Sequence, residues 1–228
     1  MPQAKHAIYI SPQVREVERL HHDLLTEEVR GLPIEDQLDR QAQRILDAHQ
    51  AGDPAVVTLI TCWHPTLVCH SAVEIMNAPF TLNDARQTVA REHGFTDWAD
   101  VETRGKIASD RDFELAVDTL LRGHLTRLEI LLAGDPSLVC RRSHFGHRAM
   151  LLHYVGSNGV ETYRQRVPIN LAEITQLLIL AGADVNARAE MYGGSTVLEL
   201  LLTSDHPAQA GVTHKVVEVL EAAGAKRN

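Results

Sequence analysis

Aromatic side chains are scarce in this 228-residue chain, where they make up only 4% of the sequence. β-Sandwiches and barrels rely on aromatic and β-branched residues, and no run of alternating β-branched residues occurs here. Hydrophobic residues still reach 44%, so aliphatic side chains and alanine must fill the core. Close-packed helices accommodate such a core, and the composition therefore predicts an all-α fold.

Clusters of basic residues and long hydrophobic runs are missing as well, and the formal net charge is −8. Phosphate backbones bind clustered Lys and Arg, so we expect no nucleic-acid partner. No hydrophobic run approaches the roughly 18 residues that a membrane span requires. The opening MPQAKHAIYI lacks the apolar core of a signal peptide. We therefore expect no membrane association and a cytoplasmic location.

Cysteine is rare, and the three residues of this type are Cys62, Cys69 and Cys140. We expect reduced thiols in a chain without a secretion signal. The segment TCWHPTLVCH at 61–70 holds cysteines and histidines, but its spacing C-x-H-x4-C-H matches no usual zinc arrangement. Signatures such as the P-loop, H-E-x-x-H and G-x-S-x-G do not occur. The sequence therefore predicts no metal and no cofactor, and it favours a protein that is not an enzyme.

Two segments of the C-terminal half end in the same pattern. LAEITQLLILAGADVNA at 171–187 and VVEVLEAAGA at 216–225 place apolar residues on one helical face and then stop at L-x-x-A-G-A. Glycine commonly ends helices in the left-handed conformation, so Gly182 and Gly224 mark the two ends. Further helices are predicted over 113–123, 124–136, 150–159 and 195–205, which gives a series of helix–turn–helix units.

The N-terminal half carries helical patterns as well. An amphipathic helix is predicted over 12–30, and further helices over 41–61 and 81–94. Helix pairs of this kind bury their apolar faces by stacking on neighbours, so we expect one continuous domain.

The helix over 12–30 is expected to cap the open end of the stack. Alternatively, its apolar stripe pairs with a copy of itself, so that the protein is either a monomer or a weak homodimer.

The C-terminal units resemble ankyrin repeats. EITQLLILAGADVN at 173–186 matches the second half of the ankyrin consensus almost letter for letter, and MLLH at 150–153 stands at its T-P-L-H position. The resemblance implies an ankyrin-type helix–turn–helix solenoid of about four to five units with an N-terminal capping helix. Residues 1–110 would then hold the cap helix and degenerate helical repeats, and 111–228 the ankyrin-like repeats. It also implies that His153 is structural, with a ring nitrogen bonded to the backbone of a neighbouring unit.

Two insertions depart from the ankyrin consensus. One lies at 160–170 and the other at 203–212, each in the join between the two helices of a unit. Repeat proteins commonly carry insertions on the face that serves their function. We expect both insertions at the same end of their helices, where they could touch.

The finger loop before 150–153 and the first insertion hold the residue types that dominate binding surfaces, since arginine, tyrosine and histidine concentrate there. In the plainest interpretation these are a solvated polar finger and an ordinary loop packed over helix ends. The resemblance instead implies a module that presents finger loops and a concave helical face to a protein partner. The residues expected to bind that partner are Arg142, His144, His147, Arg148, Tyr163, Arg164, Arg166, Tyr192 and His206.

The alternative is a small-molecule-binding protein or a cofactor-independent enzyme that takes an anionic substrate. A His/Tyr/Arg pocket would lie beneath the insertions at 160–170 and 203–212, because scaffolding alone does not require them. Arginines would hold the anion, and His144, His147, Glu161 and Tyr163 would move protons.

Overall fold

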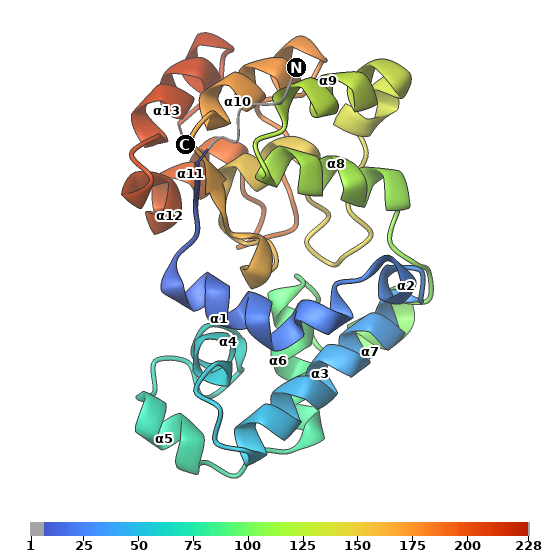
Figure 1. The fold of residues 1–228 in the computed structure, drawn as a ribbon, viewed down its shortest axis with the longest axis vertical. Coiled ribbons are helices and arrows are strands. Elements are labelled where there is room, and N and C mark those ends of the chain that lie inside the picture. The colour runs from blue at the N-terminus through green and yellow to red at the C-terminus, as the bar shows by residue number, and fades with distance from the viewer. Residues whose placement is uncertain (1–6, 228) are drawn as a thin grey trace.

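The computed structural model describes residues 7–227, and most of them are helical, as the composition predicted (Figure 1). The chain forms two halves, which we define as the N-terminal half, residues 12–104, and the C-terminal half, residues 111–222. The elements of the first half are α1 (Pro12–His21), the 3₁₀ turn η1 (His22–Leu24), α2 (Glu27–Arg30), α3 (Ile34–Gln50), α4 (Val56–Trp63), α5 (Ala72–Asn77), α6 (Leu82–Glu92) and α7 (Trp98–Arg104). No helix in the described part of the chain could cross a bilayer.

The N-terminal half is a bundle around α3. Apolar residues at helical spacing line one face of this helix and are fully buried: Ile34, Leu38, Ala42 and Ile45. The main partner of α3 is α6, which also packs on α4, whereas α3 and α4 contact each other less extensively. The degenerate repeats that we expected within residues 1–110 stay a prediction.

The C-terminal half contains three helix pairs with a shared aliphatic core. Their elements are α8 (Arg111–Leu121), α9 (Leu125–Gly134), the 3₁₀ turn η2 (Pro136–Val139), the 3₁₀ helix η3 (Leu151–Gly156), α10 (Leu171–Leu180), α11 (Val197–Thr203), α12 (Asp205–Gln209) and α13 (Thr213–Ala222). Neighbouring pairs stack, since η3 packs on α11 and α10 packs on α13. Gly182 and Gly224 adopt positive φ directly after α10 and α13, which confirms the predicted helix ends.

The segment 12–30 is not the single helix that we predicted. It breaks after α1, passes through η1, and starts again at α2, whose first turn is capped by Thr26. The apolar stripe of α1, with Val14, Val17 and Leu20, is buried inside the protein. Helix α1 lies on the side of the N-terminal half that faces the C-terminal half (Figure 1), and it packs on α3, α4 and the first insertion. Its stripe is therefore occupied within the chain and is not free to pair with a second copy.

The predicted helix over 150–159 is the short 3₁₀ helix η3. It stops because Ser157 adopts the left-handed conformation, with a φ of 47°. His153 fixes its first turn, since the ring Nδ1 accepts a hydrogen bond from the Met150 backbone nitrogen at 3.1 Å. On the other side of the ring, Nε2 lies 3.1 Å from the Ala187 carbonyl oxygen in the next unit. The structural role expected of His153 is confirmed.

The insertion at 160–170 folds between the halves rather than projecting into solvent. It contains the 3₁₀ turn η4 (Thr162–Arg164) and the strand β2 (Val167–Pro168). Strand β2 pairs antiparallel with β1 (Ile8–Tyr9), which precedes α1. The turn η4 packs on α1, so the insertion becomes the joint between the two hydrophobic cores. Phe145 and Tyr163, both from the C-terminal half, are buried in the N-terminal core.

Candidate functional site

Three of the predicted partner-binding residues hold the finger loop in shape. Arg142 donates from Nη1 to two backbone carbonyl oxygens at 2.9 Å, and Arg148 donates to another at 3.0 Å. The His144 ring Nδ1 lies 2.8 Å from the Ala108 carbonyl oxygen. Each of these side chains is thus half-buried and bonded to backbone, so the finger is not the fully solvated polar loop of the plainest interpretation.

Four other predicted site residues lie inside the protein. His147 and Glu161 expose none of their side chains, Arg164 exposes 3%, and Tyr163 is buried. The reason is the position of the first insertion, which α1 and α8 cover from two sides. These side chains cannot touch a large partner, which corrects our expectation that His147, Tyr163 and Arg164 bind one.

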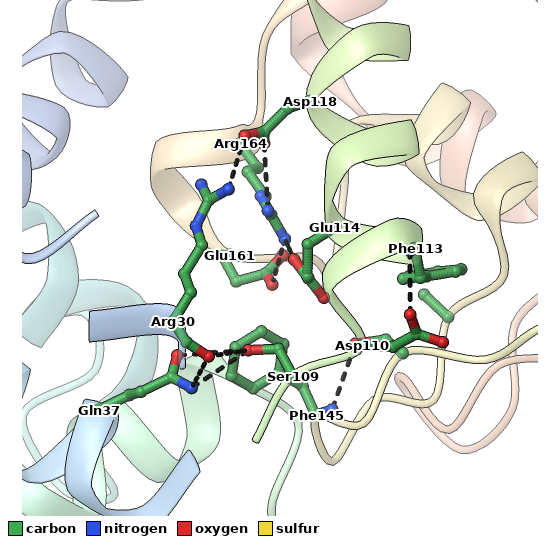
Figure 2. Close-up of polar contacts among 12 residues, drawn as sticks. Arg30, Gln37, Ser109, Asp110, Phe113, Glu114, Asp118, Phe145, Glu161 and Arg164 are labelled. Carbon is green, nitrogen blue, oxygen red and sulfur yellow. Dashed lines mark hydrogen bonds and ion pairs between the residues drawn. The ribbon is translucent and has the colours of Figure 1, made fainter. Parts of the chain in front are cut away.

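Arg164 is the centre of a buried charge cluster. Its guanidinium lies 2.6 Å from Glu114, 3.1 Å from Glu161 and 3.1 Å from Asp118. Arg30 from α2 contacts the second oxygen of Asp118 at 2.7 Å. Figure 2 shows the arginines converging on these carboxylates from the insertion and the N-terminal half. The cluster therefore joins α2, α8 and the insertion, which belong to different halves.

Burial and charge pull the carboxyl pKa values in opposite directions. Burial alone would raise the pKa of Glu161, but the Arg164 guanidinium and His147 hold it below its ordinary range. Asp118 behaves alike, because Arg164 and Arg30 outweigh its burial and lower its pKa. For Glu114 burial dominates over Arg164 and raises the pKa. The cluster is a structural ion network in which Arg164 contacts all three carboxylates and Arg30 contacts Asp118 as well.

A second buried acid lies behind the insertion. Burial raises the pKa of Glu92 to about 7, although its Oε1 accepts a hydrogen bond from the Thr162 backbone nitrogen at 3.0 Å. The neighbouring His93 is also fully buried, and burial lowers its pKa to about 4. Thr162 in turn accepts a hydrogen bond from Trp63 Nε1 at 3.2 Å. Through Thr162, this buried acid is connected to a side chain that reaches the surface.

That surface is a groove between the halves. It consists of two adjoining hollows of about 540 and 310 Å³, which share Cys62, Trp63, Val68 and Tyr192. The larger hollow is lined by both insertions, as Thr162 and Gln165 come from the first and His206 from the second. The other residues of the larger hollow are mostly uncharged hydrogen-bonding side chains: Ser11, Gln13, Thr58, Thr61, Ser157, Asn158, Thr203, Ser204 and Gln209. We call this feature the groove below.

The two insertions touch at the groove, as we expected. The His206 ring Nε2 lies 3.2 Å from Gln165 Oε1, and burial lowers the pKa of that histidine. Tyr192, a predicted binding residue, stands at the middle of the groove with 62% of its surface exposed. Its hydroxyl donates to Asn158 Oδ1 at 3.0 Å. Tyr192 and His206 are therefore the predicted residues that reach this site.

Backbone conformations that side chains rarely adopt gather around the groove. Among the described residues, the non-glycine positions with positive φ are Cys69, Arg148, Ser157 and Tyr192. Ser157 and Tyr192 line the groove, and Cys69 follows Val68, which also lines it. Such conformations cost free energy and cluster at ligand-binding sites. They single out the groove as the candidate functional site.

Several residues of these sites escaped the sequence reasoning. Trp63 was considered only as part of the segment at 61–70, and Glu92, Glu114 and Arg30 were not considered. Glu114 and Asp118 stand at i and i+4 on α8, where two carboxylates repel each other unless a cation lies between them, which was a usable signal for a buried arginine. Glu92 gave no such signal, because only the folded chain places Thr162 beside it.

No family model matches this chain, and neither the curated proteins nor the solved structures contain a match. Its function must therefore be inferred from the side chains that line its surfaces.

Proposed function

We propose that this protein is an ankyrin-type binding module that holds an extended segment of a protein partner in the groove between its halves. The ankyrin assignment is supported by three stacked helix pairs in 111–222 and by the two backbone contacts of the His153 ring. The array would include these three units, with the N-terminal bundle in place of the capping helix. The partner would lie across the junction of the two parts.

The lining of the groove carries this proposal. An extended peptide presents a backbone N–H and C=O at each residue, and these groups need partners when they leave water. The groove offers many uncharged hydroxyl and amide groups, among them Thr61, Asn158 and Gln209. Charged side chains are few along it, with Asp205 in one hollow and Arg91 and Glu190 in the other. An uncharged stretch of peptide fits this surface better than the anionic ligand that we predicted.

Two aromatic side chains give the groove an anchor point. Trp63 is half-buried and Tyr192 exposed, and both line the two hollows. Tryptophan and tyrosine are the residue types that most often dominate the binding free energy of interfaces. A partner side chain with an apolar surface would pack between them, beside Val68. Tyr192 also accepts an unfavourable backbone conformation at this place, which a role in binding would explain.

A photo-crosslinking amino acid at position 192 tests the proposal in the cell. The matched control carries the same amino acid at Leu180, which is 77% exposed on α10 and lies outside the groove. We expect a discrete crosslinked protein from position 192 and none from position 180, with one contiguous peptide of the partner attached. Equal crosslinking from both positions, or none from 192, would refute the proposal.

A small polar molecule is the second candidate, because both insertions line the larger hollow. Its volume of about 540 Å³ lies within the usual range of small-molecule sites. Native mass spectrometry of the purified protein separates the candidates. A reproducible mass increment below that of a peptide, lost on Trp63→Ala, would favour the small molecule over the protein partner.

A further inference from the structure

A second hollow lies on the other side of the first insertion. This cavity of about 430 Å³ is bounded by α1, η1 and α2 of one half, by α8 of the other, and by the insertion. The insertion separates it from the groove, since Thr162 and Gln165 line the groove while Tyr163, Arg164 and Arg166 line the cavity. We call it the arginine cavity, because Arg30, Arg122, Arg164 and Arg166 all contribute to its lining.

Three of these arginines are already paired with carboxylates. Arg30 and Arg164 share Asp118, and Arg166 lies 2.9 Å from Glu18. Arg122 differs, because it is exposed and forms no side-chain hydrogen bond or ion pair with any residue between 7 and 227. It directly follows α8, so it stands one helical turn from Asp118 at the edge of the cavity. Arg122 thus has no direct hydrogen-bond or ion-pair partner, although its charge helps to lower the pKa of Asp118 and the carboxyl of Glu27 also lines the cavity.

Apolar side chains form another part of the wall. Leu121 and Tyr163 are buried, and Leu25 and Leu115 are half-buried at the same cavity. A ligand that enters would place part of its surface against these side chains. It would also contact the guanidinium of Arg122, whose N–H donors form no hydrogen bond to another described side chain. Planar guanidinium groups bind carboxylate and phosphate oxygens through paired N–H donors.

We propose that the arginine cavity binds a small organic anion, with a carboxylate or phosphate group on Arg122 and an apolar body against Leu25, Leu121 and Tyr163. Arg166 lines the same cavity, and because Glu18 balances its charge it would contribute N–H donors rather than net positive charge. Arg30 and Arg164 line the cavity and remain paired with Asp118 when the ligand binds. This site is independent of the groove, so the proposal does not require a protein partner.

Benzoate and phenyl phosphate are suitable probes, with benzamide as the neutral analogue of benzoate. Binding is measured by NMR titration of the full chain with labelled leucine methyl groups. We expect benzoate, phenyl phosphate or both to shift the methyl signals of Leu25 and Leu121, and benzamide to bind at least about tenfold more weakly. The two anions distinguish a carboxylate ligand from a phosphate ligand.

Arg122→Gln removes the unpaired cation, and Arg127→Gln is its control. Arg127 is another exposed arginine, on α9, that lies outside the cavity and forms no ion pair within the described residues. We expect Arg122→Gln to weaken the binding of the anionic probes about tenfold and Arg127→Gln to leave it unchanged. The proposal is overturned if neither anion shifts the two leucines, if benzamide binds as tightly, or if both variants bind like the parent.

Discussion

Arg164→Met is the substitution that tests the role of the buried charge cluster most directly. Methionine keeps an unbranched apolar stem of similar length but removes the guanidinium. Arg164 exposes only 3% of its side chain and contacts Glu114, Glu161 and Asp118 within 3.1 Å. The variant therefore leaves at least Glu161 and Glu114 buried without their counter-charge, because neither contacts another arginine or lysine in the described chain.

Removing one member of a buried ion pair typically costs about 3–5 kcal/mol, because the remaining charge stays desolvated. We expect a loss of that size in the free energy of unfolding near neutral pH. The loss should shrink as the pH falls. Without Arg164, burial raises the pKa of Glu161 above its unfolded value, so the penalty is present at high pH and disappears as the carboxyl takes up a proton.

Urea unfolding followed by circular dichroism, at about pH 7 and about pH 5, measures both effects. Arg19→Met is the control, because Arg19 also contacts two carboxylates but is 56% exposed, so solvent screens its pairs. If Arg164→Met proves unfolded at neutral pH, Arg164→Lys keeps the charge and should recover folding. Equal losses for Arg164→Met and Arg19→Met, or a loss that does not depend on pH, would refute the reasoning.

Three further predictions concern backbone, groove and pH. Gly94→Ala should lower the free energy of unfolding in urea by about 1–3 kcal/mol more than Gly52→Ala does. A Cβ at Gly94 would overlap the His147 backbone, whereas Gly52 has nearly the same positive φ but open space around it. Tyr192→Gly should leave the free energy of unfolding equal or higher, since glycine relieves a φ of 48°, yet it should abolish the binding of a partner or ligand in the groove. Burial lowers the pKa of His21 to about 3, so stability should fall as the pH drops below about 6.5, and His21→Leu should reduce that slope by about 1.4 kcal/mol per pH unit.

Each of these predictions has an outcome that contradicts it. Equal costs at Gly94 and Gly52 would mean that the finger loop does not press on the end of α6. Retained binding by Tyr192→Gly would remove the groove as the candidate site. An unchanged pH slope in His21→Leu would mean that His21 takes up its proton in the folded chain as readily as in the unfolded one.

The sequence by itself determined features that depend on neighbours along the chain. Helix α10 and its end at Gly182 follow from apolar spacing and from the freedom of glycine at positive φ. His153 was identified as structural from its position in a repeat, and its two backbone contacts agree. The contact between the insertions, through His206 and Gln165, followed from their equivalent places in adjacent units.

Only the tertiary structure decided which polar residues are inside. Arginine is almost never fully buried unless it is paired, so Arg164 in a loop was predicted to be at the surface. Its burial depends on Glu114 and Asp118, which lie on a helix some fifty residues earlier. The position of α1 was also decided by the tertiary structure, although the sequence showed its apolar stripe. Whether that stripe capped a stack, joined two copies or filled the space between two halves depended on surfaces that no local pattern describes.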